Sequence, residues 1–162
     1  MNIKTIDEML ELKYYQKRLM AVDLGEKTIG VSMSDQTWTI ANPVTVIQRT
    51  SYRADIQTIV KYIEDYRVAG IIVGLPRNMN GTYGPQAEKM RAFASEIMEN
   101  CAIPVALWDE RMSTMAVNRT MLTADMSRAR RAKVVDKLAA TYILQGALDY
   151  LNLLERRREA VQ

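Results

Sequence analysis

The chain contains no histidine among its 162 residues, and its only cysteine is Cys101. Without histidine it cannot form a Ser-His-Asp or Cys-His catalytic group, or a zinc site with histidine ligands. A single cysteine excludes an internal disulfide, which is usual for a cytoplasmic protein. No apolar run reaches the roughly 20 residues of a membrane-spanning helix, and the N-terminus lacks the apolar core of a signal peptide. We therefore expect a cytoplasmic protein that, as an enzyme, would use carboxylates, lysines, hydroxyls or a metal bound by oxygen.

The positive charge of the chain is small in total but unevenly distributed. The net charge is +3 and the isoelectric point is near 9.0. Six basic residues surround Asp136 or precede it closely: Arg119, Arg128, Arg130, Arg131, Lys133 and Lys137. Such a run is compatible with a solvated helix end, and equally with contacts to the phosphates of an anionic substrate. A second basic group, at residues 156–158, is more simply explained as a complement to the dipole of a C-terminal helix.

Hydrophobic periodicity predicts one α/β domain. Strands are expected at residues 19–23, 28–34, 39–47, 70–74 and 105–109. Helices are expected at residues 6–15, 52–66, 85–101, 113–123 and 132–157, with a basic loop before the last of them. The first three strands are joined by connections short enough for antiparallel hairpins, whereas a helix precedes each of the last two. We therefore predict a mixed five-stranded sheet, three antiparallel strands and then two parallel ones, with helices on both faces.

The predicted organisation has an N-terminal helical arm at residues 1–18, the α/β domain at residues 19–157 and a tail at residues 158–162. The helix at residues 6–15 carries only a narrow apolar stripe and is marginal by itself, so it is expected to lie outside the main fold. It should then fray, or pack on a hydrophobic groove of its own domain or of a neighbouring chain. The last arrangement would allow a homodimer.

Three acidic residues stand where buried segments end: Asp23, Glu110 and Asp136. Asp23 follows the apolar run at residues 19–22, and Glu110 follows shortly after the run at residues 105–108. A carboxylate at the margin of a core is costly unless something compensates its charge. A divalent metal ion shared by all three would compensate them and would also supply chemistry.

Asp136 is placed on the final helix in line with Ala140 and Ile143, which puts it on the apolar side of that helix. Each of the three acids also has a structural interpretation. Asp23 would cap a strand-to-turn junction, and Glu110 would pair with Arg111 or cap a helix at Ser113. Asp136 would be an acid in the first turn of a helix, where the helix dipole favours it. Asp109 is the rival of Glu110, because a shift of one residue along a strand exchanges the two faces.

Four motifs, in the same order as these acids, resemble the YqgF (RuvX) family of the ribonuclease H-like superfamily. They are Ala21-Val22-Asp23-Leu24-Gly25 with Gly30, Val73-Gly74-Leu75-Pro76 with Asn78-Met79-Asn80-Gly81, Asp109-Glu110-Arg111-Met112-Ser113-Thr114, and Asp136-Lys137-Leu138-Ala139-Ala140 with Ile143-Leu144-Gln145. The resemblance covers about residues 19–151. It implies a ribonuclease H-like fold and an endonuclease that processes the 5′ end of the 16S ribosomal RNA precursor. It also implies that Asp23, Glu110 and Asp136 are catalytic, metal-binding carboxylates.

The expected chemistry is metal-assisted hydrolysis of a phosphodiester bond. Two Mg²⁺ or Mn²⁺ ions, about 4 Å apart, would lie between the three carboxylates. Polar and basic side chains would hold structured RNA, the precursor of 16S rRNA within the small ribosomal subunit: Arg77, Asn78, Asn80, Arg111, Ser113, Thr114, Arg128, Arg130, Arg131 and Lys133. Since no recognisable base-reading pattern is present, selectivity should come from RNA shape.

Three other functions remain open. A junction resolvase would cut branched DNA symmetrically as a dimer. A non-catalytic RNA-binding or ribosome-maturation factor would keep the fold without activity, although the three acids argue against it. A sugar-kinase or actin-like phosphotransferase would also begin with an acidic residue after its first strand, but it needs two such domains, and this chain has room for one.

Overall fold

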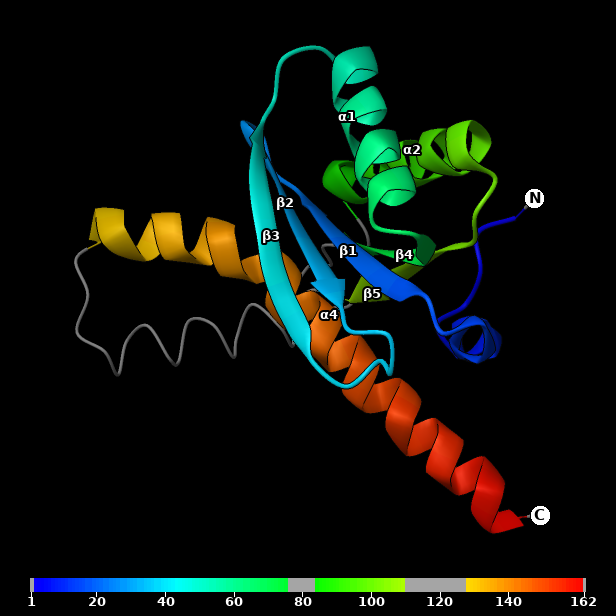
Figure 1. The fold of residues 1–162 in the computed structure, drawn as a ribbon. Helices are drawn as coiled ribbons and strands as arrows, with labels where there is room; N and C mark the ends of the chain where they lie inside the picture. Colours follow the sequence, from blue (N-terminus) through cyan, green and yellow to red (C-terminus); the bar gives the residue numbers. More distant parts are fainter. Residues whose placement is uncertain (1, 76–83, 110–127, 162) are drawn as a thin grey trace.

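A five-stranded mixed sheet forms the centre of the protein (Figure 1). The computed structural model describes residues 2–75, 84–109 and 128–161, and for residues 128–137 the description is limited to the backbone. The strands lie in the order β3-β2-β1-β4-β5, with β1 at Arg18–Leu24, β2 at Thr28–Ser34, β3 at Ala41–Gln48, β4 at Val68–Leu75 and β5 at Val105–Asp109. β2 pairs antiparallel with β1 and β3, whereas β4 is parallel to β1 and β5. The predicted sheet is therefore confirmed.

Helices α1 and α2 cover one face of the sheet (Figure 1). α1 spans Tyr52–Asp65 and begins at Ser51, whose side chain accepts a hydrogen bond from the amide of Ala54. This bond satisfies one of the amides that the first helical turn leaves unpaired. α2 spans Pro85–Cys101, and Pro85 stands in the first turn, where its missing N–H is not needed. The helices predicted at residues 52–66 and 85–101 are thus confirmed.

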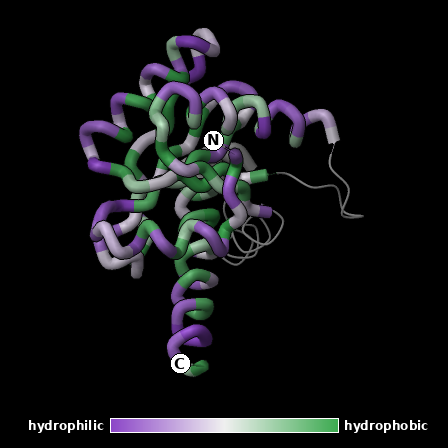
Figure 2. The backbone as a smooth tube through the Cα atoms, turned by 90° about the vertical axis from the view of Figure 1, so that its right-hand side faces the viewer, coloured by the Kyte–Doolittle hydropathy of each residue, from purple (hydrophilic) through white to green (hydrophobic). Residues whose placement is uncertain are grey.

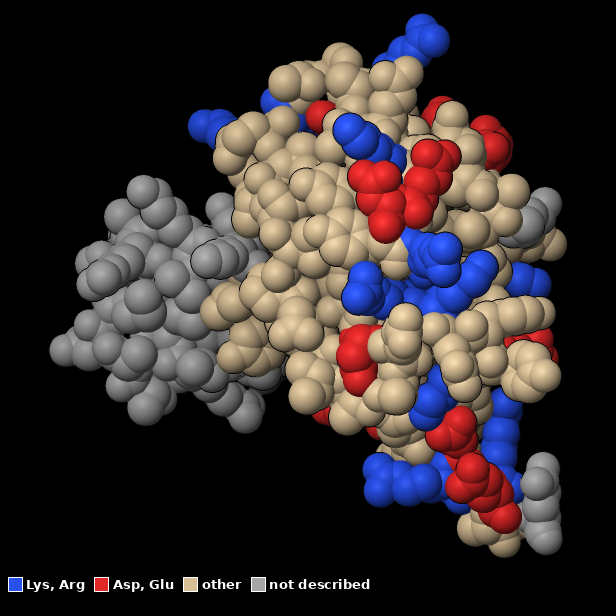
Figure 3. Space-filling view, viewed as in Figure 1, with Lys and Arg blue, Asp and Glu red and all other residues tan. Residues whose placement is uncertain are grey.

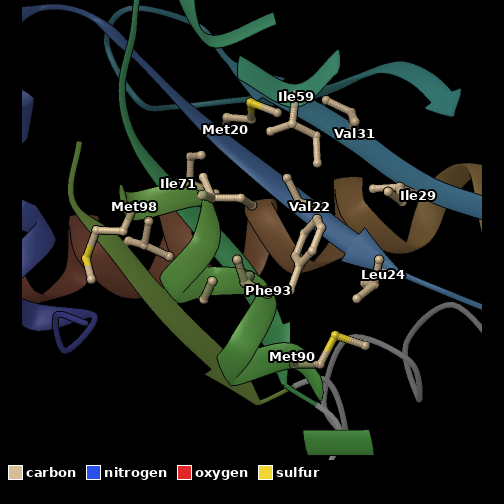
Figure 4. Close-up of a cluster of buried hydrophobic side chains, with 14 of the residues drawn as sticks. Met20, Val22, Leu24, Ile29, Val31, Ile59, Ile71, Met90, Phe93 and Met98 are labelled. Atoms are coloured by element: carbon tan, nitrogen blue, oxygen red, sulfur yellow. The ribbon is translucent and has the colours of Figure 1, made fainter. Parts of the chain in front are cut away.

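Alternate residues of β1 point to opposite faces and build two separate cores. Met20, Val22 and Leu24 belong to the core under α1 and α2. Figure 4 shows these side chains on the same side of the sheet as Ile59 of α1 and Phe93 of α2. Leu19 and Ala21 of the same strand belong instead to the second core, on the other face. β1 is therefore buried on both faces along most of its length.

The second face is covered by α4, at Arg128–Val161, and by the short 3₁₀ helix η1, at Asp7–Tyr15. The buried side of α4 consists of Ala140, Ile143, Leu144, Ala147, Leu148 and Leu151. Hydrophobic segments gather in the interior in Figure 2, whereas the last turns of α4 project beyond the body. Residues 156–161 are accordingly exposed. None of the described helices is long and apolar enough to cross a membrane.

The N-terminal segment differs from its prediction, because it does not lie outside the main fold. Met9 of η1 is fully buried in the core under α4, and Leu12 packs against the same core. Gly70 of β4 makes this approach possible, since a Cβ built there would lie 2.6 Å from Met9 Cε and 2.7 Å from Leu12 Cδ1. Of the arrangements considered, the structure shows packing on its own domain.

Polar contacts connect the same segment to β5 and to α4. The amide of Lys4 donates a hydrogen bond to the carbonyl of Val105 at 2.8 Å. The side chain of Lys13 reaches Asn152 Oδ1 at 2.9 Å and Glu155 Oε1 at 2.8 Å. The N-terminal segment therefore fastens the C-terminal half of α4 to the sheet.

α4 is longer than predicted at both ends. It begins at Arg128 rather than near residue 132, so part of the expected basic loop is the first turn of the helix. It ends at Val161, so residues 158–161 continue the helix and are not a separate tail. Arginine and alanine favour helix at both ends, and no proline interrupts residues 128–161. The helix predicted at residues 113–123 lies outside the described residues.

Candidate active site

Asp23 lies near the carboxyl end of β1, on the face of the sheet that α4 covers. It follows Leu19 and Ala21 in the alternation, and both of these residues belong to the core under α4. The buried run of β1 is thus what directs the carboxylate toward this face. Asp23 is partly buried, and one strand residue, Leu24, separates it from the turn that starts at Gly25.

Glycines occupy the neighbouring positions on the strands beside Asp23. Gly30 of β2 is its partner in the antiparallel ladder. β1 and β4 pair in parallel up to Val22 and Val73, so the same register carried one residue further places Gly74 beside Asp23. Because glycine has no side chain, neither adjacent strand crowds the carboxylate with one.

The carboxylate of Asp23 makes no hydrogen bond or ion pair with the described residues. Asp55, in the first turn of α1, shows the contrasting case of a buried acid with partners. It is 3% exposed, accepts a hydrogen bond from the amide of Thr50 and lies 3.5 Å from Arg49 Nε. Asp55 is therefore compensated within the protein, whereas Asp23 has no such partner in the part of the chain that the structure describes.

The path of α4 over the sheet can be followed through two hydrogen bonds. The side chain of Gln145 accepts from the amide of Ala41, which pairs with Ser34 near the far end of β2. Five residues earlier in α4, the carbonyl of Ala140 accepts from Ser32 Oγ at 2.8 Å. Toward its N-terminus, α4 thus advances along β2 toward Gly30, the ladder partner of Asp23.

Asp136 lies one turn before Ala140 in the same helix. Its backbone position continues the path of α4 toward the Asp23 end of β1. The buried line predicted to follow it holds at Ala140, Ile143 and Ala147, and it ends at Tyr150, which is 36% exposed. That Asp136 and Asp23 share one site stays a prediction.

Asp109, the rival of Glu110, alternates with Val105 and Leu107 on β5, and these two residues pack in the core under α1 and α2. Its register partner Leu75 belongs to that core as well. By this alternation Asp109 lies on the opposite face of the sheet from Asp23. Trp108, the residue before Asp109 on β5, packs against the core under α4 instead.

Most predicted site residues fall outside the described part of the chain. These are Glu110 together with Arg77, Asn78, Asn80, Arg111, Ser113 and Thr114. Four others lie in the first turns of α4, where only the backbone is described: Arg128, Arg130, Arg131 and Lys133. Among the described side chains, no group of three or more acidic, cysteine or histidine residues is placed to hold a metal ion.

Arg49 is a residue near this end of the sheet that the sequence analysis missed. Its Nη1 donates a hydrogen bond to the carbonyl of Gly25 at 2.6 Å, and its amide donates to the carbonyl of Lys27. With its ion pair to Asp55, it joins the turn after β1 to the start of α1. The only sequence signal is an arginine six residues before an acid, which is too common to identify such a link.

Basic and acidic side chains are interspersed on the face shown in Figure 3. A group of Lys and Arg lies near the middle of the view, with acidic side chains above and below it. Among the described residues seen from this side, there is no broad surface of one sign. Net charge alone therefore does not identify a nucleic-acid surface here, and position relative to Asp23 has to be considered.

The sheet topology and the acid at the end of its central strand define a protein of the ribonuclease H-like fold. The structure of RuvC from Thermus thermophilus, solved in complex with a Holliday junction substrate, aligns with a TM-score of 0.53 at 10% identity. The alignment covers 84% of this chain and 96% of that chain. At this identity the likeness concerns the fold alone.

Sequence comparison identifies the family. The family model described as "RuvX: Holliday junction resolvase" matches residues 17–150. Proteins named "Putative pre-16S rRNA nuclease" are 50% identical in Paracoccus denitrificans, over 83% of this chain and 85% of the relative, and 46% identical in Rhizobium johnstonii, over 96% and 95%. This chain belongs to the RuvX family, as its motifs indicated.

Proposed function

We propose that this protein is a metal-dependent nuclease that hydrolyses phosphodiester bonds in the precursor of 16S rRNA. The observation that carries the proposal is Asp23, a partly buried carboxylate at the end of β1 without a partner among the described residues. Relatives that carry the name of such a nuclease match more than four fifths of the chain. The chain lacks histidine, so a hydrolytic mechanism has to use carboxylates and oxygen-bound metal rather than an imidazole base.

The described surroundings of Asp23 fit a divalent cation. Its carboxylate has no hydrogen-bond or ion-pair partner among the described residues, and the flanking glycines leave the adjacent strands without side chains at that row. Mg²⁺ and Mn²⁺ prefer oxygen ligands of this kind. When bound, such ions would activate water and stabilise the departing oxygen. Asp23 would hold the metal together with Glu110 and Asp136, since Asp109 faces the other side of the sheet.

The first turns of α4 would hold the substrate beside this site. The first turns of α4 extend past the edge strand β3 (Figure 1), and the N-terminus of a helix carries the positive end of its dipole. Arg128, Arg130, Arg131 and Lys133 would add positive charge there and bind flanking phosphates. The segments that contain Arg77, Asn78 and Asn80, and Arg111, Ser113 and Thr114, would contact the nucleic-acid backbone around the bond that is cut. Such a protein would act in the cytoplasm.

A second candidate, cleavage of branched DNA, is favoured by the description of the family model as a Holliday junction resolvase. A resolvase acts symmetrically on two strands, so this function would require a homodimer. The RNA function requires no dimer. The oligomeric state during cleavage therefore separates the two candidates.

The test compares two substrates under identical conditions: a pre-16S rRNA fragment and a four-way DNA junction, each with Mn²⁺, with Mg²⁺ and with a chelator. The proposal predicts cleavage of the RNA only when metal is present. Metal-dependent, paired cuts in the junction and none in the RNA would favour the resolvase. If the protein binds RNA but cleaves neither substrate with either metal, it is a non-catalytic maturation factor.

A further inference from the structure

A groove of about 500 Å³ opens beside the turn that follows β1, on the side of α1 and α2. Its lining comes from three segments of the chain that meet at this end of the sheet: Leu24, Glu26, Arg49, Tyr52, Gln86, Lys89 and Ala92. Leu24 immediately follows Asp23 on β1 and faces the other side of the sheet, so the groove and the candidate metal-binding carboxylate lie on opposite faces near the end of the same strand. None of these lining residues was among the predicted site residues.

The lining combines an aromatic surface, cations and an apolar floor. Tyr52 is 43% exposed, and its ring packs edge-on against Phe93 at 6.1 Å, which fixes its orientation. Leu24 is buried and, with Ala92, provides the apolar part. Lys89 stands on the exposed side of α2, one turn from Gln86. A fixed aromatic ring beside cations is the arrangement with which proteins bind single strands of nucleic acid.

Arg49 lines the groove, but part of its guanidinium group already has partners within the protein. Its Nη1 and Nε atoms are already engaged by Gly25 and Asp55, and Asp55 offsets its charge. The guanidinium still has further N–H groups to donate. Glu26 contributes the one negative charge among the described lining residues, and it disfavours a phosphate next to the turn. We therefore expect a phosphate of the ligand to contact Lys89, and the polar edge of a base or sugar to lie near Glu26.

We propose that this groove binds the nucleic-acid strand next to the bond that is cut, with one base stacked on Tyr52 and a neighbouring phosphate contacted by Lys89. The inference rests on the proposed nuclease function and adds a specific substrate-binding surface to it. A strand that passes over the end of β1 would contact Asp23 on one face of the sheet and the groove on the other.

Binding of labelled single strands of about 12 nucleotides, as RNA and as DNA of the same sequence, tests the proposal in a chelator, so that no strand is cut. Tyr52→Ser should weaken binding on the order of tenfold, and Tyr52→Phe should restore it, because the stacking surface is kept. Lys89→Glu should weaken binding and lower the salt dependence. Matched controls are Tyr14→Ser, at an 87% exposed tyrosine, and Lys61→Glu, which changes the net charge equally on the exposed side of α1.

The groove is supported if its variants lose affinity and the matched controls do not, and the arm that responds, RNA or DNA, identifies the strand. It is refuted if Tyr52→Ser and Lys89→Glu bind both strands as well as Tyr14→Ser and Lys61→Glu do. Metal-dependent cleavage by the wild-type protein is measured in parallel. Selective loss of binding without any wild-type cleavage would overturn the nuclease proposal and leave the groove in place, whereas cleavage without selective loss would overturn the groove alone.

Discussion

Replacing Met9 with alanine should destabilise the protein by on the order of 3 kcal/mol. Met9 is fully buried although it belongs to the N-terminal segment, and it packs in the core under α4. The position beneath it is Gly70, which has no side chain to move into the space left by the missing thioether. The cavity would therefore persist, and a persistent cavity places the cost within the range typical of a buried methionine rather than at its lower end.

Urea and thermal unfolding measure this effect. The free energy of unfolding should fall without a change in the urea dependence, and the thermal midpoint should fall by on the order of 10 °C for a chain of this size. Tyr14→Ala is the matched control, since Tyr14 lies in the same η1 helix but is 87% exposed, and its cost should stay within about 0.5 kcal/mol. Equal stability of the two variants would refute the claim that Met9 anchors the N-terminal segment in the core under α4.

Three further results are expected. Asp55→Ala should lower the free energy of unfolding by about 3 kcal/mol, because it leaves Arg49 without its buried partner. A loss no larger than that caused by Asp65→Ala would contradict this. Burial, with a smaller effect of Glu64, raises the pKa of the Cys101 thiol from 9.0 to about 11. Ellman's reagent should thus react slowly at pH 8, and the stabilising effect of the neutral thiol, complete below pH 9.0, should be lost as pH rises toward about 11. The first turns of α4 are tested by charge reversal in Arg128→Glu, Arg130→Glu and Arg131→Glu. For RNA, the magnitude of the slope of log affinity against log salt should fall by roughly 0.7–0.9 per lost phosphate contact, with little change in thermal midpoint. An unchanged slope would show that these residues do not contact the substrate.

The sheet was predictable because its strands are short apolar runs bounded by turn residues. The run before Asp23 and the glycine-containing turn after it define β1 and the place where its carboxylate emerges. Alternation along β1 then follows from strand geometry, and it decides which face Asp23 occupies. Local sequence is sufficient for these features because each depends on neighbouring residues only.

Features that depend on distant partners were not predictable from local sequence. Met9 is buried because Gly70, far along the chain, leaves space on β4, and a narrow apolar stripe gives no indication of that space. Arg49 and Asp55 read as ordinary polar residues, although they join the turn after β1 to α1. The assignment of Glu110 and Asp136 as partners of Asp23 also depends on long-range geometry, and it stays a prediction.

The most direct test of the account is metal-dependent cleavage by Asp23→Asn. Asparagine has the shape of aspartate, and the carboxylate has no hydrogen bond or ion pair with the described residues, so folding should be unchanged. Asp65→Asn is the control, since it removes an equal charge at an exposed position at the end of α1. With Mn²⁺ and a pre-16S rRNA fragment, the account predicts full cleavage by Asp65→Asn and none by the folded Asp23→Asn protein. Full cleavage by Asp23→Asn would contradict the assignment of Asp23 as a metal-binding catalytic residue.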